Sequence, residues 1–266
     1  MRVFDFNSAI VRTPGRSVVR GLRANDGPAP DFDIIVAEHR SYSTALRAAG
    51  VQVTVLPALE SYPDSVFVED PALVFTQAAV LLRPGAPSRM AEAQELSEAL
   101  SSRFREVLHL NDGFADGGDI LVTPRGVLIG LSARTDATGA DHLRMLLRSI
   151  GLVSHVVQVP RGTLHLKSDC SLVDEETVLA TEELAKSGIL DGFRILVVPA
   201  DERSATNALR VNDVIFVKAN CPRTRDMLLT HGLNVLPLPV SEIARIDAGL
   251  SCMSLRWFDP NYPAPA

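Results

Sequence analysis

Residues 140–160, ADHLRMLLRSIGLVSHVVQVP, combine the two kinds of element that alternate along this chain. A helix is predicted over residues 140–149, and the Val-rich run after it predicts a strand over residues 153–159, followed by a proline. The same succession ends at Leu56-Pro57, Val198-Pro199 and Leu236-Pro237. Repeats of roughly 20–50 residues are typical of solenoids and propellers. An ordinary α/β sheet with chance prolines explains the pattern equally well, so periodicity leaves both architectures open.

Short segments rich in Val, Ile and Leu alternate with helical patterns along the whole chain. The other predicted helices cover residues 41–49, 88–102, 181–186 and 222–230. The other predicted strands cover residues 34–36, 51–56, 72–82, 120–123, 127–129, 171–173, 178–180, 194–198, 214–218 and 234–237. No linker or low-complexity segment divides the chain, which predicts a single domain over residues 1–266. Residues 21–31 are rich in Gly, Pro and Asp, and are predicted as a surface insertion or a lid loop.

The composition is that of a globular protein with a large core: 266 residues, 46% hydrophobic and 22% charged. A formal net charge of −6 argues against nucleic acid and anionic membrane surfaces as partners, because both call for basic patches. No apolar run is long enough to span a bilayer, and the first residues lack the apolar segment of a signal peptide. The three cysteines form no disulfide framework, so a reducing cytoplasm is expected.

Cys252 is a candidate nucleophile because of its surroundings. It lies in residues 246–256, IDAGLSCMSLR, a polar and turn-prone stretch with a carboxylate upstream and a cation downstream. A structural cysteine is usually a small buried hydrophobe among apolar residues, and that remains the commoner role for a lone thiol. Cys170 is predicted as such a core residue, and Cys221, before a proline, as a loop residue.

Two acidic runs lie beside β-forming segments. In residues 62–71, YPDSVFVEDP, Glu69 and Asp70 come just before a proline, which suggests a strand end that opens into a pocket. In Asp116-Gly117-Gly118-Asp119, two acids flank a glycine pair. A turn with solvated carboxylates is the alternative for both runs and is the commoner case in proteins at large.

His165, in Leu164-His165-Leu166-Lys167, is the candidate general acid and base. A lone histidine between leucines is more often a satisfied core residue. Metal ligation by His165 with Cys170 is conceivable, but no third or fourth ligand has a suitable spacing, so no metal site is predicted.

Together these segments resemble the dimethylarginine dimethylaminohydrolase family, members of the guanidine-modifying superfamily with the five-bladed α/β-propeller fold. The resemblance covers almost the whole chain, in the family's order, and is most specific in residues 64–70, DSVFVED, and 251–256, SCMSLR. The other matching stretches are residues 9–17, 83–85, 117–119, 132–135, 164–167 and 222–225. The resemblance therefore implies an α/β propeller of five pseudo-symmetric ββαβ repeats.

The resemblance also implies roles for particular residues. Cys252 matches the nucleophile and His165 the general acid and base. Asp116 matches an acid that is Glu in bacterial members and Asp in mammalian ones. The other implied positions are substrate-binding: Asp70 and Asp247 for the guanidinium, Phe67 and Glu69 along the channel, and Leu22, Asp64, Arg89, Arg134 and Ile246 for the amino-acid end.

The implied reaction is hydrolysis of methylated arginines to citrulline and methylamine or dimethylamine, through a covalent adduct on Cys252 and without metal or cofactor. Because carboxylates are implied around Cys252, its thiol is expected to be protonated in the empty enzyme. Three alternatives stay open: an arginine deiminase or amidinotransferase on the same scaffold, a non-catalytic binding protein, and a zinc-binding protein that uses Cys252 and His165. The substrate is a small molecule, and a homodimer is one candidate assembly.

Overall fold

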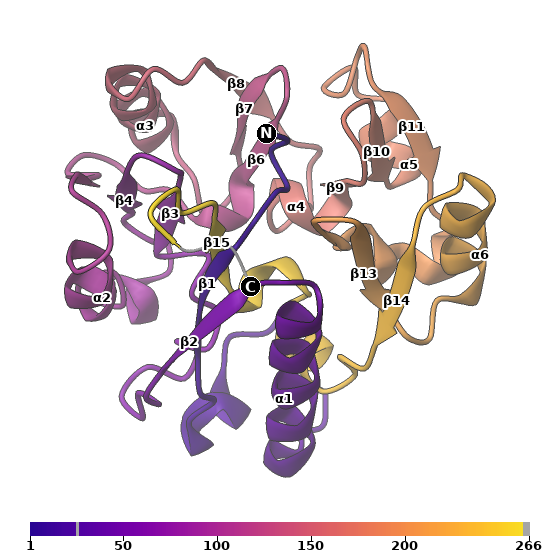
Figure 1. Cartoon of the computed structure of the whole chain (residues 1–266), viewed down its shortest axis with the longest axis horizontal. Helices are drawn as coiled ribbons and strands as arrows, with labels where there is room; N and C mark the ends of the chain where they lie inside the picture. The colour runs from indigo at the N-terminus through magenta and orange to yellow at the C-terminus, as the bar shows by residue number, and fades with distance from the viewer. Residues whose placement is uncertain (25–26, 263–266) are drawn as a thin grey trace.

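The computed structural model describes residues 1–24 and 27–262, and it contains five three-stranded sheets around a common centre (Figure 1). In every sheet the middle strand pairs antiparallel with one neighbour and parallel with the other. Each parallel pair is joined through a connection that contains a helix, as parallel strands require. This repeated ββαβ unit confirms the predicted five-bladed α/β propeller, and the alternative of one ordinary sheet is wrong.

Four blades follow one another along the chain. The first contains β3 (Ala72–Val74), β4 (Ala79–Leu81), α2 (Ser97–Ser101) and β5 (Val107–His109). The second contains β6 (Ile120–Thr123), β7 (Gly126–Leu131), α3 (Ala137–Ser149) and β8 (Ser154–Gln158). The third contains β9 (Cys170–Leu172), β10 (Thr177–Ala180), α5 (Glu182–Ala185) and β11 (Arg194–Val197). The fourth contains β12 (Leu209–Val211), β13 (Val214–Lys218), α6 (Pro222–Thr230) and β14 (Val235–Leu238).

The fifth blade joins the two ends of the chain. β15 (Leu255–Trp257) pairs antiparallel with β1 (Ser8–Arg12), and β1 pairs parallel with β2 (Gln52–Leu56) after α1 (Phe32–Ala48). Figure 1 shows the yellow C-terminal strand beside the indigo N-terminal strand. The first strands of the blades, β3, β6, β9, β12 and β15, line one common cavity of about 340 Å³ at the centre of the propeller. We call these five the inner strands.

Proline marks the end of the third strand in four blades, which explains the repeat seen in the sequence. Pro57 follows β2 directly, and Pro160 and Pro199 follow β8 and β11 after one further residue. In the fourth blade the equivalent residue is Pro239, because Pro237 lies within β14 and pairs with Val217. Since proline cannot donate to the ladder, it suits a position where pairing stops.

Several predicted boundaries are wrong for local reasons. Residues 34–36, predicted as a strand, belong to α1, because Asp31 caps the helix by accepting from the amides of Asp33 and Ile34. Residues 72–82 form the β3–β4 hairpin instead of one strand. Residues 88–102 form two 3-10 turns, η2 (Pro87–Arg89) and η3 (Gln94–Leu96), before α2. The strands β1, β5, β12 and β15, most of them only three residues long, were not predicted.

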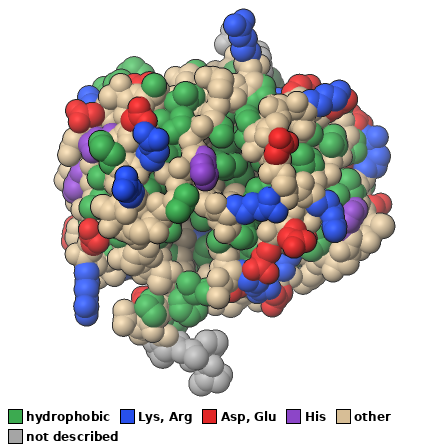
Figure 2. Space-filling model, turned by 90° about the horizontal axis from the view of Figure 1, so that it is seen from above, with side chains coloured by type: hydrophobic (Ala, Val, Ile, Leu, Met, Phe, Trp, Pro, Cys, Tyr) green, Lys and Arg blue, Asp and Glu red, His purple; other side chains and the backbone are tan. Residues whose placement is uncertain are grey.

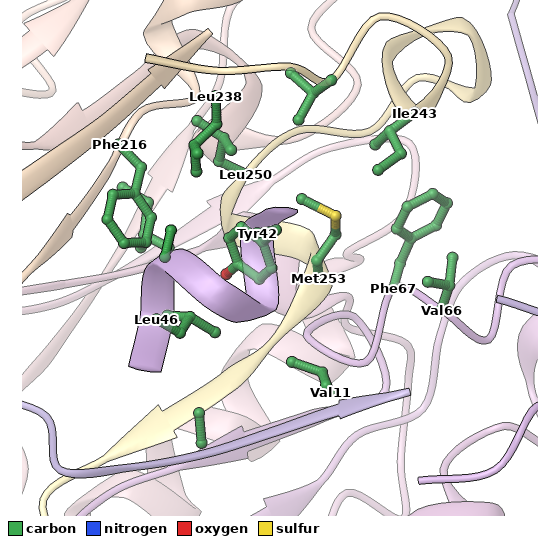
Figure 3. Packing of buried hydrophobic residues seen from close by; sticks show 14 of the residues in the cluster. Val11, Tyr42, Leu46, Val66, Phe67, Phe216, Leu238, Ile243, Leu250 and Met253 are labelled. Atoms are coloured by element: carbon green, nitrogen blue, oxygen red, sulfur yellow. The ribbon is translucent and has the colours of Figure 1, made fainter. Parts of the chain in front are cut away.

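The largest hydrophobic cluster packs under the C-terminal segment that carries Cys252. Tyr42 from α1, Phe67, Phe216 from β13 and Met253 all belong to it, and Figure 3 shows them facing one another. The Tyr42 hydroxyl also lies 2.5 Å from Ser254 Oγ. Leu250 belongs to the same cluster, so the core fixes residues on both sides of Cys252.

The surface carries mixed charge. On the face drawn in Figure 2, Lys and Arg side chains are interspersed with Asp and Glu, unlike the continuous basic stripe typical of nucleic-acid binders. Among residues 1–24 and 27–262, no helix is both long enough and apolar enough to cross a membrane.

Candidate active site

A cavity of about 780 Å³ is lined by segments that lead into the inner strands of the blades. Gly118 in η4 (Gly117–Asp119) leads into β6, and His165, the N-cap of α4 (Leu166–Asp169), leads into β9. Asn207 precedes β12, and Cys252 in η7 (Ser251–Met253) precedes β15. The propeller thereby brings residues that are far apart in sequence into the lining of one cavity.

Cys252 is a partly exposed residue in an otherwise buried turn. Its neighbours Ser251 and Met253 are buried, while its carbonyl accepts a hydrogen bond from the Glu69 amide at 3.2 Å. Burial raises the pKa of the Cys252 thiol to about 12, and the carboxylates of Asp70 and Glu69 act in the same direction. The thiol is therefore protonated at neutral pH when the cavity holds no cation.

His165 is paired with a buried carboxylate. Its Nε2 lies 3.1 Å from Asp116 Oδ2, and Asp116 is fully buried. Burial alone would lower the pKa of His165, but the hydrogen bond to Asp116 and the nearby Asp70 and Asp119 outweigh it, so the net shift is upward. This imidazole is consequently able to hold a proton and to release it in a reaction.

Asp116 is held in place by backbone and side-chain contacts. Its Oδ1 accepts from the Gly85 amide at 2.7 Å, and its own amide donates to Thr135 Oγ1 at 3.1 Å. Arg134 Nη1 lies 3.8 Å from Asp116 Oδ2, which places a half-buried cation beside the His165–Asp116 pair.

Asp119 holds in place the backbone that carries His165 of the His165–Asp116 pair. Its Oδ1 accepts from the Leu166 amide at 2.9 Å, one residue after His165. Its Oδ2 accepts from the hydroxyls of Ser132 and Thr135, both at 2.7 Å. The backbone that carries His165 is thus tied to the segment that carries Asp116.

Asp70 lies behind the cavity wall, next to Gly118. Its Oδ1 accepts from the Gly118 amide at 3.0 Å, and its Oδ2 forms an ion pair with Arg89. Burial acts to raise the pKa of Asp70, but the cations Arg89, His165 and Lys167 outweigh it, so the pKa is lowered. Asp70 is therefore an anion in the folded protein.

Arg89 is enclosed by protein groups. Its Nε and Nη2 bind Glu92, its Nη1 binds Asp70, and its Nη2 also donates to the carbonyls of Asp64 and Phe67 at 3.2 and 3.0 Å. The residue is 4% exposed and does not line the cavity. In this structure Arg89 organises the turn at residues 64–70.

Glu69 and Phe67 both face protein. Glu69 binds Arg256 Nη2 through Oε1 and Lys167 Nζ through Oε2, at 2.7 and 2.8 Å. Phe67 lies in the hydrophobic cluster with Met253. Neither residue is on the wall of the 780 Å³ cavity.

The remaining predicted substrate-binding residues lie around the start of the candidate lid. The Leu22 amide donates to Asp64 Oδ1 at 2.9 Å, and the Ala24 amide donates to the exposed carboxylate of Asp247. Ile246 is buried in the large cluster, and Asp247 has a left-handed backbone with φ of 54°. Two residues of the predicted lid 21–31, numbers 25 and 26, lie outside the described residues.

Comparison with known proteins identifies the family. The family described as N,N dimethylarginine dimethylhydrolase, eukaryotic, matches residues 32–209. The N(G),N(G)-dimethylarginine dimethylaminohydrolase of Pseudomonas aeruginosa is 36% identical over 254 residues, covering 95% of this chain and 100% of that protein. The chain belongs to the dimethylarginine dimethylaminohydrolase family.

Further relatives of this dimethylarginine dimethylaminohydrolase family member agree with that result. The enzyme of that name from Streptomyces coelicolor is 31% identical, covering 93% of this chain and 96% of its own. A Pseudomonas aeruginosa structure, a cysteine-to-serine mutant complexed with citrulline, superposes with a TM-score of 0.91 over 95% of this chain and 100% of that one. The N-terminal domain of ArgZ, at 17% identity and a TM-score of 0.84 over 96% of this chain and 99% of its own, shares the fold.

Sequence reasoning missed three residues that line the cavity or bind the residues behind it. Lys167 lines the cavity and neutralises Glu69, and its place two residues after His165 in a quoted motif was an available signal. Glu92 binds Arg89 with i,i+3 spacing, which the sequence also offered. Asn207 lines the cavity 45 residues before Cys252 in the chain, and no local pattern indicated it.

One group of side chains has the spacing of metal ligands. Asp70, Asp116 and His165 each offer one ligand atom, and these atoms lie within 4.8 Å of one another. Both carboxylates already accept hydrogen bonds from protein donors, and Asp70 is paired with Arg89. The arrangement suits the exchange of protons and the binding of an organic cation.

Proposed function

We propose that this protein hydrolyses Nω-methylated arginines to citrulline and methylamine or dimethylamine. The observation that carries the proposal is that Cys252 and His165 line one cavity, and that the buried acids Asp116 and Asp70 bind the lining residues His165 and Gly118. A thiol, a proton carrier and carboxylates are the groups needed to attack a planar cation. Family membership supports the same reaction, because relatives at 36% and 31% identity bear this enzyme's name.

In the proposed complex the carboxylates hold the guanidinium. Each carboxylate oxygen has two lone pairs, so Asp70 is able to keep Arg89 and Gly118 and still accept from the substrate. Gly118 has no side chain to separate the cavity from Asp70. We propose that positive charge at this place lowers the pKa of the Cys252 thiol, offsetting the effect of Asp70 and Glu69.

The first chemical step forms a bond between Cys252 Sγ and the guanidinium carbon. The bond from that carbon to the methylated nitrogen then breaks, and His165 gives its proton to the departing amine. A thiouronium adduct remains on Cys252. In the second step His165 takes one proton from water as the oxygen attacks the same carbon. The C–S bond then breaks, and the remaining hydroxyl proton passes to the departing sulfur, which releases citrulline and restores the Cys252 thiol. Asp116 keeps the imidazole oriented through both steps.

At the amino-acid end we propose contacts with Arg134, with Asp64 and with the backbones of Leu22 and Ile246. Arg134 is half-buried, and its one ion-pair contact among the described residues, with Asp116 at 3.8 Å, is longer than a hydrogen bond, so its guanidinium is available to a substrate carboxylate. We assign Arg89 the task of holding Asp70 and the turn at 64–70. Asp247, which binds the Ala24 amide, is proposed to fasten the lid loop.

Citrulline release tests the proposal. We expect asymmetric dimethylarginine and monomethylarginine to give citrulline. Arginine should give little citrulline. Preference for arginine would instead identify a deiminase on this scaffold. Binding of methylarginines without product would identify a non-catalytic binding protein.

We also propose a cytoplasmic location and leave a homodimer as a prediction. The three cysteines are free thiols, which supports a reducing compartment.

A further inference from the structure

Four of the five blades each supply a residue to the proposed reaction centre, always from the segment just before an inner strand. Asp70 precedes β3, Asp116 precedes β6, His165 precedes β9 and Cys252 precedes β15. In the remaining blade, the residue in the corresponding place before β12 is Asn207, which lines the same cavity. By the pseudo-symmetry of the fold, Asn207, which has no assigned role, therefore occupies the position that carries a reaction-centre residue in the other four blades.

Asn207 connects the nucleophile segment with the acid–base segment. Its Oδ1 accepts from the Ser251 amide, one residue before Cys252, at 3.0 Å. Its Nδ2 donates to the Lys167 carbonyl, two residues after His165, at 2.9 Å, and to Ser251 Oγ at 3.1 Å. One amide group therefore touches both segments that must cooperate in the reaction.

Gly249 packs directly against the side-chain amide of Asn207. A β-carbon at Gly249 would collide with Asn207 Oδ1, at a separation that real β-carbons do not reach. The turn that leads to Cys252 is therefore packed directly on the carboxamide.

The backbone that carries Asn207 is itself fixed. The neighbouring Thr206 is fully buried, and its hydroxyl contacts the Ser168 carbonyl at 2.6 Å and the Arg203 carbonyl at 2.7 Å. An amide on a rigid support is able to fix the position of the groups that it binds.

We propose that Asn207 is a positioning residue that sets the placement of Cys252 relative to His165. The role needs an acceptor and a donor on one short side chain, which a carboxamide supplies. An aspartate would keep the contact to the Ser251 amide but could not donate to the Lys167 carbonyl, and alanine would lose both contacts. The inference rests on the proposed function, since it takes Cys252 as the nucleophile.

Asn207→Ala is the direct test, with Asn212→Ala as its matched control. Asn212 is also half-buried, and its amide also accepts one backbone hydrogen bond, from Phe6, and donates two, to the carbonyls of Phe6 and Ala49. It lies on the β12–β13 turn and does not line the 780 Å³ cavity. Both variants should lose thermal stability, so activity is to be measured per folded molecule, below the unfolding range.

We expect Asn207→Ala to lower kcat for dimethylarginine on the order of 10- to 100-fold, with KM within about threefold of wild type. Asn212→Ala should keep both constants. In a Cys252→Ser background, calorimetry should show equal affinity for dimethylarginine with and without the Asn207→Ala substitution. Asn207→Asp, which nearly preserves shape, should also lose kcat and serves if the alanine variant does not fold.

The inference is overturned if Asn207→Ala and Asn207→Asp turn over at the wild-type rate, or if they lose activity only through unfolding, as the control does. A rise in KM with unchanged kcat would also overturn it, because that result marks a substrate contact. Failure of the proposed function would be seen separately, as the absence of citrulline release from methylarginines by the wild-type enzyme.

Discussion

A β-carbon on Gly118 would lie 2.6 Å from Nδ1 of His165. The same β-carbon would lie 3.0 Å from Asp70 Oδ1, which accepts a hydrogen bond from the Gly118 amide. The His165 imidazole therefore approaches the Gly118 peptide from the side of the cavity wall, and the Asp70 carboxylate approaches it from behind that wall. Gly118 is required for this close approach and not for an unusual backbone angle, since its φ is outside the left-handed range.

Gly118→Ala should displace His165 and lower kcat on the order of 10- to 100-fold. Gly151→Ala is the matched control, because among the described residues nothing lies within 4 Å of its β-carbon position. Its φ of +81° makes alanine strained by about 1 kcal/mol, so the control should lose stability and keep its turnover. Steady-state rates and denaturant unfolding of both variants distinguish the two effects. Wild-type turnover by Gly118→Ala would contradict the packing argument.

Cys252→Ser should keep the fold and abolish citrulline formation, because an alcohol is hardly ionised at neutral pH and is a weak nucleophile. Cys170→Ser and Cys221→Ser serve as controls, since both thiols are buried away from the 780 Å³ cavity. Each should retain turnover per folded molecule. Substantial activity in Cys252→Ser would show that another group attacks the substrate.

The thiol of Cys252 should be protonated in the empty enzyme at neutral pH and should ionise when a guanidinium binds. Burial and the neighbouring carboxylates raise its pKa to about 12, and a bound cation acts against them. Ultraviolet absorbance of the thiolate, measured in wild type against Cys252→Ser with and without an unreactive guanidinium, reports both states. A thiolate already formed at neutral pH without ligand would favour a preformed ion pair with His165.

The sequence indicated the repeat and most of its elements because strands and helices of this fold are set by local patterns. Prolines after the third strands and the proline in the first turn of α6 are local features, and α6 was predicted over its observed range. Three-residue strands carry too little pattern to be recognised. β1 and β15 pair across the whole length of the chain, which no local signal reveals.

The candidate site was predictable where the residues stand in distinctive runs, such as Asp70, His165 and Cys252. The partners of these residues were harder to predict, because burial and pairing depend on tertiary contacts. Arg89 was expected at the substrate's amino-acid end, but the structure surrounds it with Asp70, Glu92 and two carbonyls. Asn207 has no motif, and only the closure of the propeller places it between Lys167 and Ser251.

Arg134→Ala and Arg89→Ala should therefore behave differently. Arg134 is half-buried and lies 3.8 Å from Asp116, so its loss should raise KM on the order of tenfold while the fold persists. Loss of Arg89 leaves Asp70 and Glu92 buried without their cation, which costs about 3–5 kcal/mol of stability. Steady-state kinetics and chemical denaturation of both variants test this contrast. If the Arg89→Ala variant were stable and differed only in a raised KM, Arg89 would bind the substrate, as expected from the sequence.

Glu92 should make the protein less stable as pH rises from about 4.3 to about 7. Burial raises its pKa to about 7, and the nearby carboxylates of Asp64 and Asp70 act in the same direction against Arg89, whereas an unfolded glutamate titrates near 4.3. Between these values the folded chain binds more protons than the unfolded chain, so the free energy of unfolding falls with pH. The raised pKa of His165 acts in the same direction above about 6.5, and the lowered pKa of Asp70 acts oppositely only below about pH 4.

Glu92→Gln isolates this contribution, because it removes the titration and keeps an acceptor for Arg89. Urea unfolding of wild type and variant at several values between pH 4.5 and pH 8 gives the two stability profiles. We expect the variant to lose less stability than wild type across that window, by at most roughly 3 kcal/mol, since 1 pKa unit corresponds to about 1.4 kcal/mol. Parallel profiles would mean that Glu92 is ionised throughout, and the buried pair would then be fully charged at low pH as well.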